Sequence, residues 1–313
     1  MVDRVDPEPR QREGGRQRAY AQMEAGASAL EAAQWYLDGA TEGLEAYLKT
    51  YRVTSHRLAE RLTGQPRLYA RLKDIVADVR PYEAEILRTV RELRTLAPKL
   101  PRVPIYIFVG VMGHGATVKE VKPEGGEQGP GVLIPIELVV LSDGQHPELA
   151  EPGQDRARLD NLIQFVAHEL VHAAQVQYQG LERYRVLYRE ASRGNHLAYA
   201  VREGGADFFC YLATGRLRER HRFLLRHEAE LWREFSKLLY EPVGAHRRWF
   251  SGTGERDPQR PARLGYAIGW SICRRYHETA PNKDQAILDI LSANEEADFG
   301  RIAAPYRQLL AGA

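Results

Sequence analysis

The sequence predicts an α+β fold that is predominantly helical and contains one small antiparallel sheet. Apolar residues recur three and four positions apart over residues 27–100, which is the period of an amphipathic α-helix. Two β-rich runs follow, at residues 103–109 and 132–141, and they are separated by glycine-rich loops. From about residue 160 onward the pattern is almost wholly helical again. Helices before and after a short pair of strands are typical of the α+β class.

The composition is that of a globular chain without a polyanion-binding surface. Of the 313 residues, 43% are hydrophobic and 27% are charged, and a chain of this length can bury a sizeable core. The 44 lysines and arginines nearly balance the 42 aspartates and glutamates, and no basic run is interleaved with aromatic residues. A nucleic-acid partner is therefore not expected. No apolar stretch approaches the roughly 18 residues of a transmembrane helix, so no transmembrane segment is expected either.

Three segments are expected along the chain: a flexible tail at residues 1–25, a helical region at 26–100, and a domain at 101–313 that carries the candidate site. The tail is polar and arginine-rich, and it lacks the apolar core of a signal peptide. The chain as given is thus expected to be cytoplasmic, or periplasmic or secreted if a signal was trimmed from it. Cys210 and Cys273 stand alone in helical patterns and are expected to be buried, unpaired thiols.

Proline and glycine mark the ends of several expected elements. Pro81 is expected to separate two helices of the N-terminal region, because proline cannot continue a helix. Pro135 predicts that the strand at 132–141 lies at the edge of the sheet, since proline has no N–H for a neighbouring strand. A long helix is expected to begin near Asp160 and to end before Gly180. Further helices are expected at residues 182–193, 196–214, 217–239, 264–278 and 283–292, with a loop at 251–263.

The long helix carries two histidines at the spacing of one helical turn. His168 and His172 are four positions apart, so both imidazoles project from one face and can reach one metal ion. Glu169 completes an H-E-x-x-H motif, in which the glutamate takes a proton from a water bound on the metal. The helix is apolar on most sides, so these polar groups should be buried, which is costly unless they have a partner. A metal ion supplies that partner. The alternative is two hydrogen-bonded core histidines beside a salt-bridged glutamate.

A third ligand is expected from a second helix, because a catalytic zinc has three protein ligands and one open position. Glu203 and Asp207 are four positions apart on one predicted helix face. Gly204 and Gly205 each cost about 1 kcal/mol relative to alanine inside a helix, which indicates a close approach to another helix. The helix with the two histidines is the expected neighbour. Glu203 is therefore predicted to be a ligand, and Asp207 to orient a ligating histidine through its outer nitrogen. The alternative is a surface pair held by neighbouring arginines.

These motifs resemble those of the gluzincin clan of zinc metallopeptidases, in which a glutamate is the third ligand and a following aspartate orients a histidine. More narrowly, the chain is similar to an uncharacterised family of bacterial zinc-dependent proteases that is distantly similar to the gliding-motility GldB-like proteins. The resemblance covers about residues 105–279. It implies a zincin-like metallopeptidase domain with its small sheet packed on the H-E-x-x-H helix. The matching stretches are Phe108-Val-Gly110, Gly115-Ala-Thr-Val118, Gly131-Val-Leu-Ile134 with Glu137, His168 to Gln175, Glu203-Gly-Gly-Ala-Asp-Phe208 and Gly265-Tyr-Ala-Ile-Gly269.

The expected activity is zinc-dependent hydrolysis of a peptide bond in a peptide or protein substrate. Glu169 is expected to act as the general base and to pass the proton to the leaving amine. Tyr266 is predicted to stabilise the oxyanion, because it lies near the start of a helix that follows a loop, between two glycines that favour close packing. The alternative is that Tyr266 is an ordinary core aromatic. The strand at 132–141 is the candidate for main-chain pairing with a substrate.

Two other functions remain open from the sequence. A zinc hydrolase with the same ligands could act on an ester, or on an amide that is not a peptide. A non-catalytic protein could use zinc to hold helices together, or could bind peptides without cleaving them. Glu169 argues against the non-catalytic alternative, because a structural zinc site needs no base. Two further histidines, His196 and His221, are expected on solvated helix surfaces.

Overall fold

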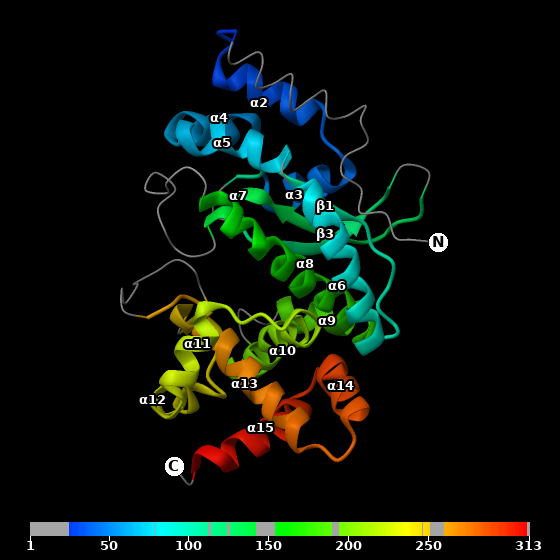
Figure 1. The fold of residues 1–313 in the computed structure, drawn as a ribbon, viewed down its shortest axis with the longest axis vertical. Helices are drawn as coiled ribbons and strands as arrows, with labels where there is room; N and C mark the ends of the chain where they lie inside the picture. The colour runs from blue at the N-terminus through cyan, green and yellow to red at the C-terminus, as the bar shows by residue number, and fades with distance from the viewer. Residues whose placement is uncertain are drawn as a thin grey trace. The chain divides into compact units, whose positions relative to one another are not determined.

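The computed structural model describes residues 25–77, 79–111, 114–123, 126–141, 154–189, 194–245, 247–250 and 260–311. The described residues are mostly helical and include a small three-stranded sheet, which confirms the predicted α+β class (Figure 1). The chain divides into two compact units. The first unit comprises residues 1–88 and 102–170, and the second comprises residues 89–101 and 171–313. Helix α8 (Gln154–Gln179) continues through the boundary, so each unit contains part of it.

The helices of the N-terminal region form where the periodicity predicts them, and side-chain caps define their starts. The hydroxyls of Ser28, Thr41 and Thr54 each accept a hydrogen bond from the backbone N–H three residues further on. Pro81 lies in a short 3₁₀ turn, η1 (Arg80–Tyr82), between the last two helices, as predicted. The helices are α2 (Ala29–Asp38), α3 (Glu42–Tyr51), α4 (Ser55–Gly64), α5 (Pro66–Ala77) and α6 (Glu83–Leu96).

The sheet is mixed, so the prediction of an antiparallel sheet is wrong in part. Its strands are β1 (Ile105–Phe108), β2 (Thr117–Val121) and β3 (Gly129–Pro135), in the spatial order β1-β3-β2. β2 and β3 form an antiparallel pair, whereas β1 and β3 run parallel. Two parallel strands need a long connection, because the chain must return to the end of the sheet where the first strand began. Here the connection from β1 to β3 contains β2. A local pattern of β-branched residues does not encode that return.

The predicted edge strand is the central strand of the sheet. β3 pairs on both sides, and β2 accompanies it only as far as Leu133. Pro135 lies beyond the end of the pairing with β2. Its missing N–H therefore leaves no hydrogen bond to β2 unformed. Residues 136–141, which were predicted to continue the strand, form helix α7 (Ile136–Leu141). A short apolar run fits a buried strand and a buried helix equally well, and this explains the error. β3 pairs on both sides at Val132 and Leu133, so residues 132–141 do not form the edge strand that was predicted to pair with a substrate.

Tyrosines from three helices hold the segment that follows β1. The hydroxyls of Tyr36, Tyr69 and Tyr47 donate hydrogen bonds to the carbonyl oxygens of residues 109, 110 and 111, at 2.7, 3.2 and 3.2 Å. These tyrosines come from α2, α5 and α3, in that order. The N-terminal helices are thus connected to the sheet of the first unit by hydrogen bonds as well as by packing.

Glu137, at the start of α7, is a buried carboxyl group in the first unit. Its Oε2 accepts a hydrogen bond from the backbone N–H of Gly110 at 2.9 Å, and only 2% of the residue is exposed. A Cβ at position 110 would lie 2.7 Å from Oε1 of Glu137, so glycine is required for this close approach. Burial raises the pKa of Glu137 to about 7. In the folded protein the protonated form of Glu137 therefore persists up to about pH 7.

The unfolding free energy of Glu137→Gln, relative to that of wild type, is expected to increase as the pH rises. The pKa of Glu137 is about 7 in the folded protein and has its ordinary value of 4.5 in the unfolded chain. Between these pH values the native state therefore binds more protons, and wild-type stability falls as the pH rises. Glutamine keeps the acceptor for Gly110 and has no proton to lose. The difference in unfolding free energy should change by about 3 kcal/mol between pH 5 and pH 8. Denaturant unfolding of both proteins with excess chelator, at a series of pH values, measures it. A difference that is constant with pH contradicts the prediction.

The second unit is helical and is built around α13. This helix contacts α10, α11, α14 and α15. The helix predicted at 217–239 is interrupted at His227, and the last helix of the chain was not predicted. The tail before residue 25 and most of the predicted loop, at 251–259, lie outside the described residues. The helices are α9 (Leu181–Arg189), α10 (His196–Thr214), α11 (Glu219–Arg226), α12 (Glu228–Phe235), α13 (Leu264–Thr279), α14 (Lys283–Ser292) and α15 (Glu296–Ala311).

Helices α10 and α13 touch backbone to backbone where two glycines meet. A Cβ at Gly204 would lie 2.1 Å from the carbonyl carbon of Gly269, and a Cβ at Gly269 would lie 1.8 Å from the carbonyl oxygen of Ala200. The predicted close approach at Gly204 is confirmed, but its neighbour is α13 rather than the helix with the two histidines. Sequence spacing shows that a glycine needs room without showing which distant segment occupies it.

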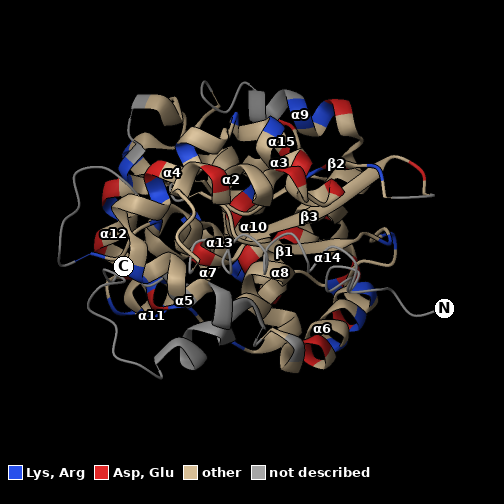
Figure 2. Cartoon of the chain, turned by 90° about the horizontal axis from the view of Figure 1, so that it is seen from above, with Lys and Arg blue, Asp and Glu red and all other residues tan. Residues whose placement is uncertain are grey.

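The charges of the described helices are mixed in sign. Acidic and basic residues alternate along helices such as α6 (Figure 2). In the part of the chain that the structure describes, no helix combines the length and apolar character needed to cross a membrane. Cys210 and Cys273 are both buried, as predicted, and they form no disulfide with each other.

Candidate metal centre

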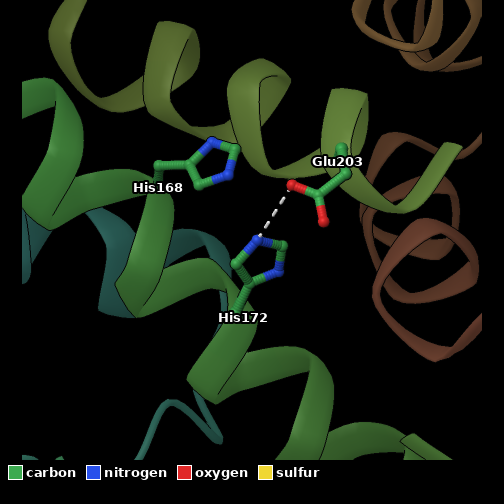
Figure 3. Close-up of side chains that lie close together, drawn as sticks. All are labelled: His168, His172 and Glu203. Atoms are coloured by element: carbon green, nitrogen blue, oxygen red, sulfur yellow. Dashed lines mark ion pairs between the residues drawn. The ribbon is translucent and has the colours of Figure 1, made fainter. Parts of the chain in front are cut away.

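Helices α8 and α10 bring two histidines and one glutamate together. His168 and His172 project from consecutive turns of α8, and Glu203 projects towards them from α10 (Figure 3). One ligand atom from each residue lies within 4.8 Å of the other two, and all three residues are buried. The residues that the sequence predicted as ligands therefore form a single cluster that can hold a metal ion.

The spacing of His172 and Glu203 fits two ligands of one ion better than an ordinary ion pair. Nε2 of His172 and Oε2 of Glu203 are 3.4 Å apart. A charge-assisted hydrogen bond between such atoms is about 2.7–2.9 Å long. Two ligands at about 2.0–2.2 Å from a tetrahedral ion are separated by roughly 3.3–3.6 Å. The observed separation is that of one edge of such a tetrahedron, so these two atoms are placed as two ligands of one metal ion.

Gln175 orients His172 from one turn further along α8. Nδ1 of His172 lies 2.8 Å from Oε1 of Gln175. The Gln175 amide is held in turn, because its Nε2 donates to the carbonyl oxygen of Arg202 at 3.1 Å. With Nδ1–H donating to Gln175, the lone pair of His172 is on Nε2, which faces Glu203. The sequence analysis did not assign this role. The feature that could have predicted this role is an amide side chain three positions after His172, on the same face of the helix.

Glu169 is buried beside the cluster but is not one of its three members. It follows His168 on α8 and is 6% exposed. Within the first unit, burial and then the Glu169 carboxylate raise the pKa of Tyr51, at the end of α3. The Tyr51 hydroxyl also donates a hydrogen bond to the carbonyl oxygen of Gly115 at 3.4 Å. Tyr51 is thus a polar neighbour of the predicted base, and the sequence analysis did not identify it.

Asp207 lies one turn beyond Glu203 on α10 and holds α11. Its Oδ2 accepts two hydrogen bonds from Arg220, at 3.1 and 2.6 Å, and one contact of 2.9 Å from Nε2 of His221. His196 and His221 were both predicted on solvated helix surfaces, but both are buried. Asp207 and Trp270 cover His221, and Phe235 and Phe250 contact His196. His172 already has Gln175 on its outer nitrogen. For His172, Gln175 has the role that was predicted for Asp207. For His168, a role for Asp207 stays a prediction.

Tyr266 lies near Glu203 as a consequence of the contact between α10 and α13. It precedes Gly269 by one helical turn, and its hydroxyl is hydrogen-bonded to the hydroxyl of Tyr199, one turn before Glu203. Burial and then the Glu203 carboxylate raise the pKa of Tyr266 well above its usual value. The hydroxyl therefore keeps its proton and can act as a hydrogen-bond donor. Tyr199 was not predicted, although it lies four positions before Glu203 on the same helix.

The fold and the cluster define an α+β protein, mostly helical, with a buried candidate metal centre. Comparison with protein-family models, with curated proteins and with solved structures found no match. The functional argument is therefore based on the residues of this chain alone.

Proposed function

We propose that the protein is a zinc-dependent metallopeptidase whose zinc is held by His168, His172 and Glu203. The observation that carries the proposal is the buried cluster of two imidazoles and one carboxylate, with ligand atoms within 4.8 Å of one another. Polar groups are costly to bury without strong partners, and a divalent ion provides one. This proposal also includes the zincin-like arrangement that the sequence motifs imply.

The donor set favours a catalytic zinc over a structural one. Catalytic zinc sites use three protein ligands such as two histidines and a glutamate, whereas structural sites are closed by four ligands that are often cysteines. Among the described residues the cluster offers three ligands. Its nitrogen and oxygen donors suit zinc, whereas calcium and magnesium prefer oxygen alone.

The residues around the cluster supply the other parts of a hydrolytic mechanism. Zinc, when bound, acts as a Lewis acid that polarises the scissile carbonyl and lowers the pKa of water towards roughly 7. Glu169 accepts the proton of the attacking water and delivers it to the leaving amine. Tyr266 donates a hydrogen bond to the oxygen of the tetrahedral intermediate. Gln175 keeps His172 in the tautomer that leaves Nε2 free to bind a metal.

The metal assignment is tested by elemental analysis of the purified protein and its variants. The wild-type chain is expected to hold about one zinc, and His168→Ala, His172→Ala and Glu203→Ala are expected to lose it. Gln175→Ala should keep the site but weaken zinc affinity by about 10- to 100-fold in a chelator titration. His227→Ala is the matched control, because this histidine is exposed on the surface. Full zinc content in all three ligand variants would show that the ligand assignment is wrong.

The reaction is tested with a panel of quenched peptides. Cleavage that a zinc chelator abolishes and added zinc restores supports a peptidase. Cleavage of ester or non-peptide amide substrates alone identifies a different zinc hydrolase. Bound zinc without turnover of either class supports a structural or peptide-binding role instead.

A further inference from the structure

Arg263 has a strained backbone at the start of α13. Its φ and ψ angles are 60° and 41°, in the left-handed region, and its side chain does not cap the helix. This conformation costs a non-glycine residue on the order of 1–3 kcal/mol. Such strain persists where the surrounding structure holds a side chain in a position that function requires. Glycine would adopt the same backbone without strain, so the presence of arginine calls for a reason.

The guanidinium of Arg263 is available for a ligand. It lies 5.9 Å from the centre of the Tyr266 ring, and the guanidinium of Arg220 lies 5.2 Å from the same ring. Arg220 is occupied by its hydrogen bonds to Asp207. Within the described part of the chain, Arg263 has no hydrogen bond or ion pair to its guanidinium. Arginine offers five N–H donors in a planar fork that matches a carboxylate.

Arg263 acts on the same tyrosines as the metal ligand Glu203. Burial, and then the Glu203 carboxylate, raise the pKa of both Tyr199 and Tyr266. The positive charge of Arg263 lowers the pKa of both tyrosines. All four residues belong to the second unit. Gly269, one turn after Tyr266 on α13, packs against the backbone of Ala200 on α10, one turn before Glu203. An anion bound by Arg263, beside the Tyr266 ring, would therefore lie close to the part of α10 that carries Glu203.

Three arginines of the second unit, Arg218, Arg220 and Arg263, lie within electrostatic reach of one another. Burial, together with the charges of Arg220 and Arg263, lowers the pKa of Arg218 to about 10. Asp207 opposes this shift, and burial also lowers the pKa of His221, which favours its neutral form. The Asp207 carboxylate supplies one negative charge to these arginines, and a bound carboxylate would supply a second.

We infer that Arg263, supported by the positive charge of Arg220, binds a carboxylate of the substrate beside the metal centre. This inference rests on the proposed peptidase function and specifies its substrate. The anionic groups of a peptide are its C-terminal carboxylate and the side chains of aspartate and glutamate. The substrate class is thus a peptide with one of these carboxylates close to the scissile bond.

The experiment measures binding in the Glu169→Gln background, so that turnover does not interfere. Three N-acetylated peptides are titrated calorimetrically: an alanine peptide with a free C-terminus, the same peptide amidated, and an amidated peptide ending in glutamate. The free acid is expected to bind about 10- to 100-fold tighter than the alanine amide, as for a hydrogen bond between charged groups. If the amidated glutamate peptide binds as tightly, the recognised carboxylate is a side chain, which also supports the subsite.

Two variants and one control identify the residue responsible. Arg263→Gln and Arg263→Gly should each remove the preference for a carboxylate, and the glycine variant also relieves the backbone strain, so its folding is secure. Arg260→Gln removes the same charge three positions earlier, where the guanidinium pairs with Glu230 and Glu234, and should keep the preference. Equal or undetectable binding of acid and amide, or a preference that survives in both Arg263 variants, overturns the inference.

Failure of this inference can be distinguished from failure of the proposed function. Arg263 is not a metal ligand, so the carboxylate preference should persist in zinc-stripped protein. Such a preference in a protein that shows no peptidase activity would retain the subsite and reject the enzyme. Zinc-dependent cleavage of acid and amide peptides with equal affinity would retain the enzyme and reject the subsite.

Discussion

Replacing Glu169 with glutamine is expected to remove nearly all hydrolysis while zinc content and melting temperature stay close to wild type. Glutamine has almost the same shape as glutamate but cannot accept the proton of the attacking water. General-base catalysis contributes roughly 10²- to 10⁴-fold to such rates, so kcat/KM should fall by that factor. The measurement is kcat/KM on the best quenched peptide, together with elemental analysis of the same preparation.

Two variants show whether this loss is specific to the base. Glu137→Gln makes the same change at another buried glutamate, which lies outside the proposed mechanism, and should retain wild-type turnover. Tyr266→Phe removes one donor to the oxyanion and is expected to lose about 10²- to 10³-fold, with zinc retained. Wild-type turnover in Glu169→Gln would refute its role as base and leave the metal site unaffected.

Gly204→Ala is expected to cause a large loss of stability in the second unit. The added Cβ would lie 2.1 Å from a backbone carbon and 2.2 Å from a backbone nitrogen of α13. No side-chain rotation can relieve a clash with backbone, so α10 and α13 must move apart and lose packing over their whole contact. Overpacking of a core costs about 1–3 kcal/mol and occasionally more, and we expect this variant to reach at least the upper value. Denaturant unfolding measures the effect.

The neighbouring glycine provides a matched control for Gly204→Ala. A Cβ at Gly205 would meet a side-chain methyl of Ile290 at 3.1 Å, which can move, and no backbone. In α15, nothing lies within 4 Å of a Cβ at Gly300. Gly300→Ala is expected to stabilise the protein by about 0.5–1 kcal/mol, because alanine is the better helix former. If Gly204→Ala is no more destabilising than Gly205→Ala, the tight contact between α10 and α13 is wrong.

Elements with a strong local signal agree with the sequence predictions. Helix α10 has the predicted bounds of 196–214, with Asn195 capping its start and Gly215 in a left-handed conformation at its end. Helix α8 ends directly before Gly180, as predicted, and Gly180 has a positive φ of 82°. Its predicted start near Asp160 is wrong, because the helix begins at Gln154. In both cases the residues that define the ends lie within a few positions of them, so a short stretch of sequence contains the information.

Elements whose character depends on distant partners were predicted less well. Whether β3 is central or at the edge depends on β1 and β2, and whether β1 runs parallel to it depends on the whole connection between them. The apolar run after Pro135 has no local feature that separates a strand from a helix, and it became α7. Secondary structure of such runs is decided by the core into which they pack.

For the candidate site, the sequence by itself determined the part that one helix carries. Two histidines four positions apart share a face of α8 by helix geometry alone, and the apolar residues around them imply burial. The tertiary structure decided the rest, because those contacts join segments that are distant along the chain. It brought Oε2 of Glu203 to 3.4 Å from Nε2 of His172. It also gave Asp207 the buried His221 as a partner and packed α13 against Gly204. Each is a long-range contact, and a local pattern can indicate that a residue needs a partner but not which residue the fold provides.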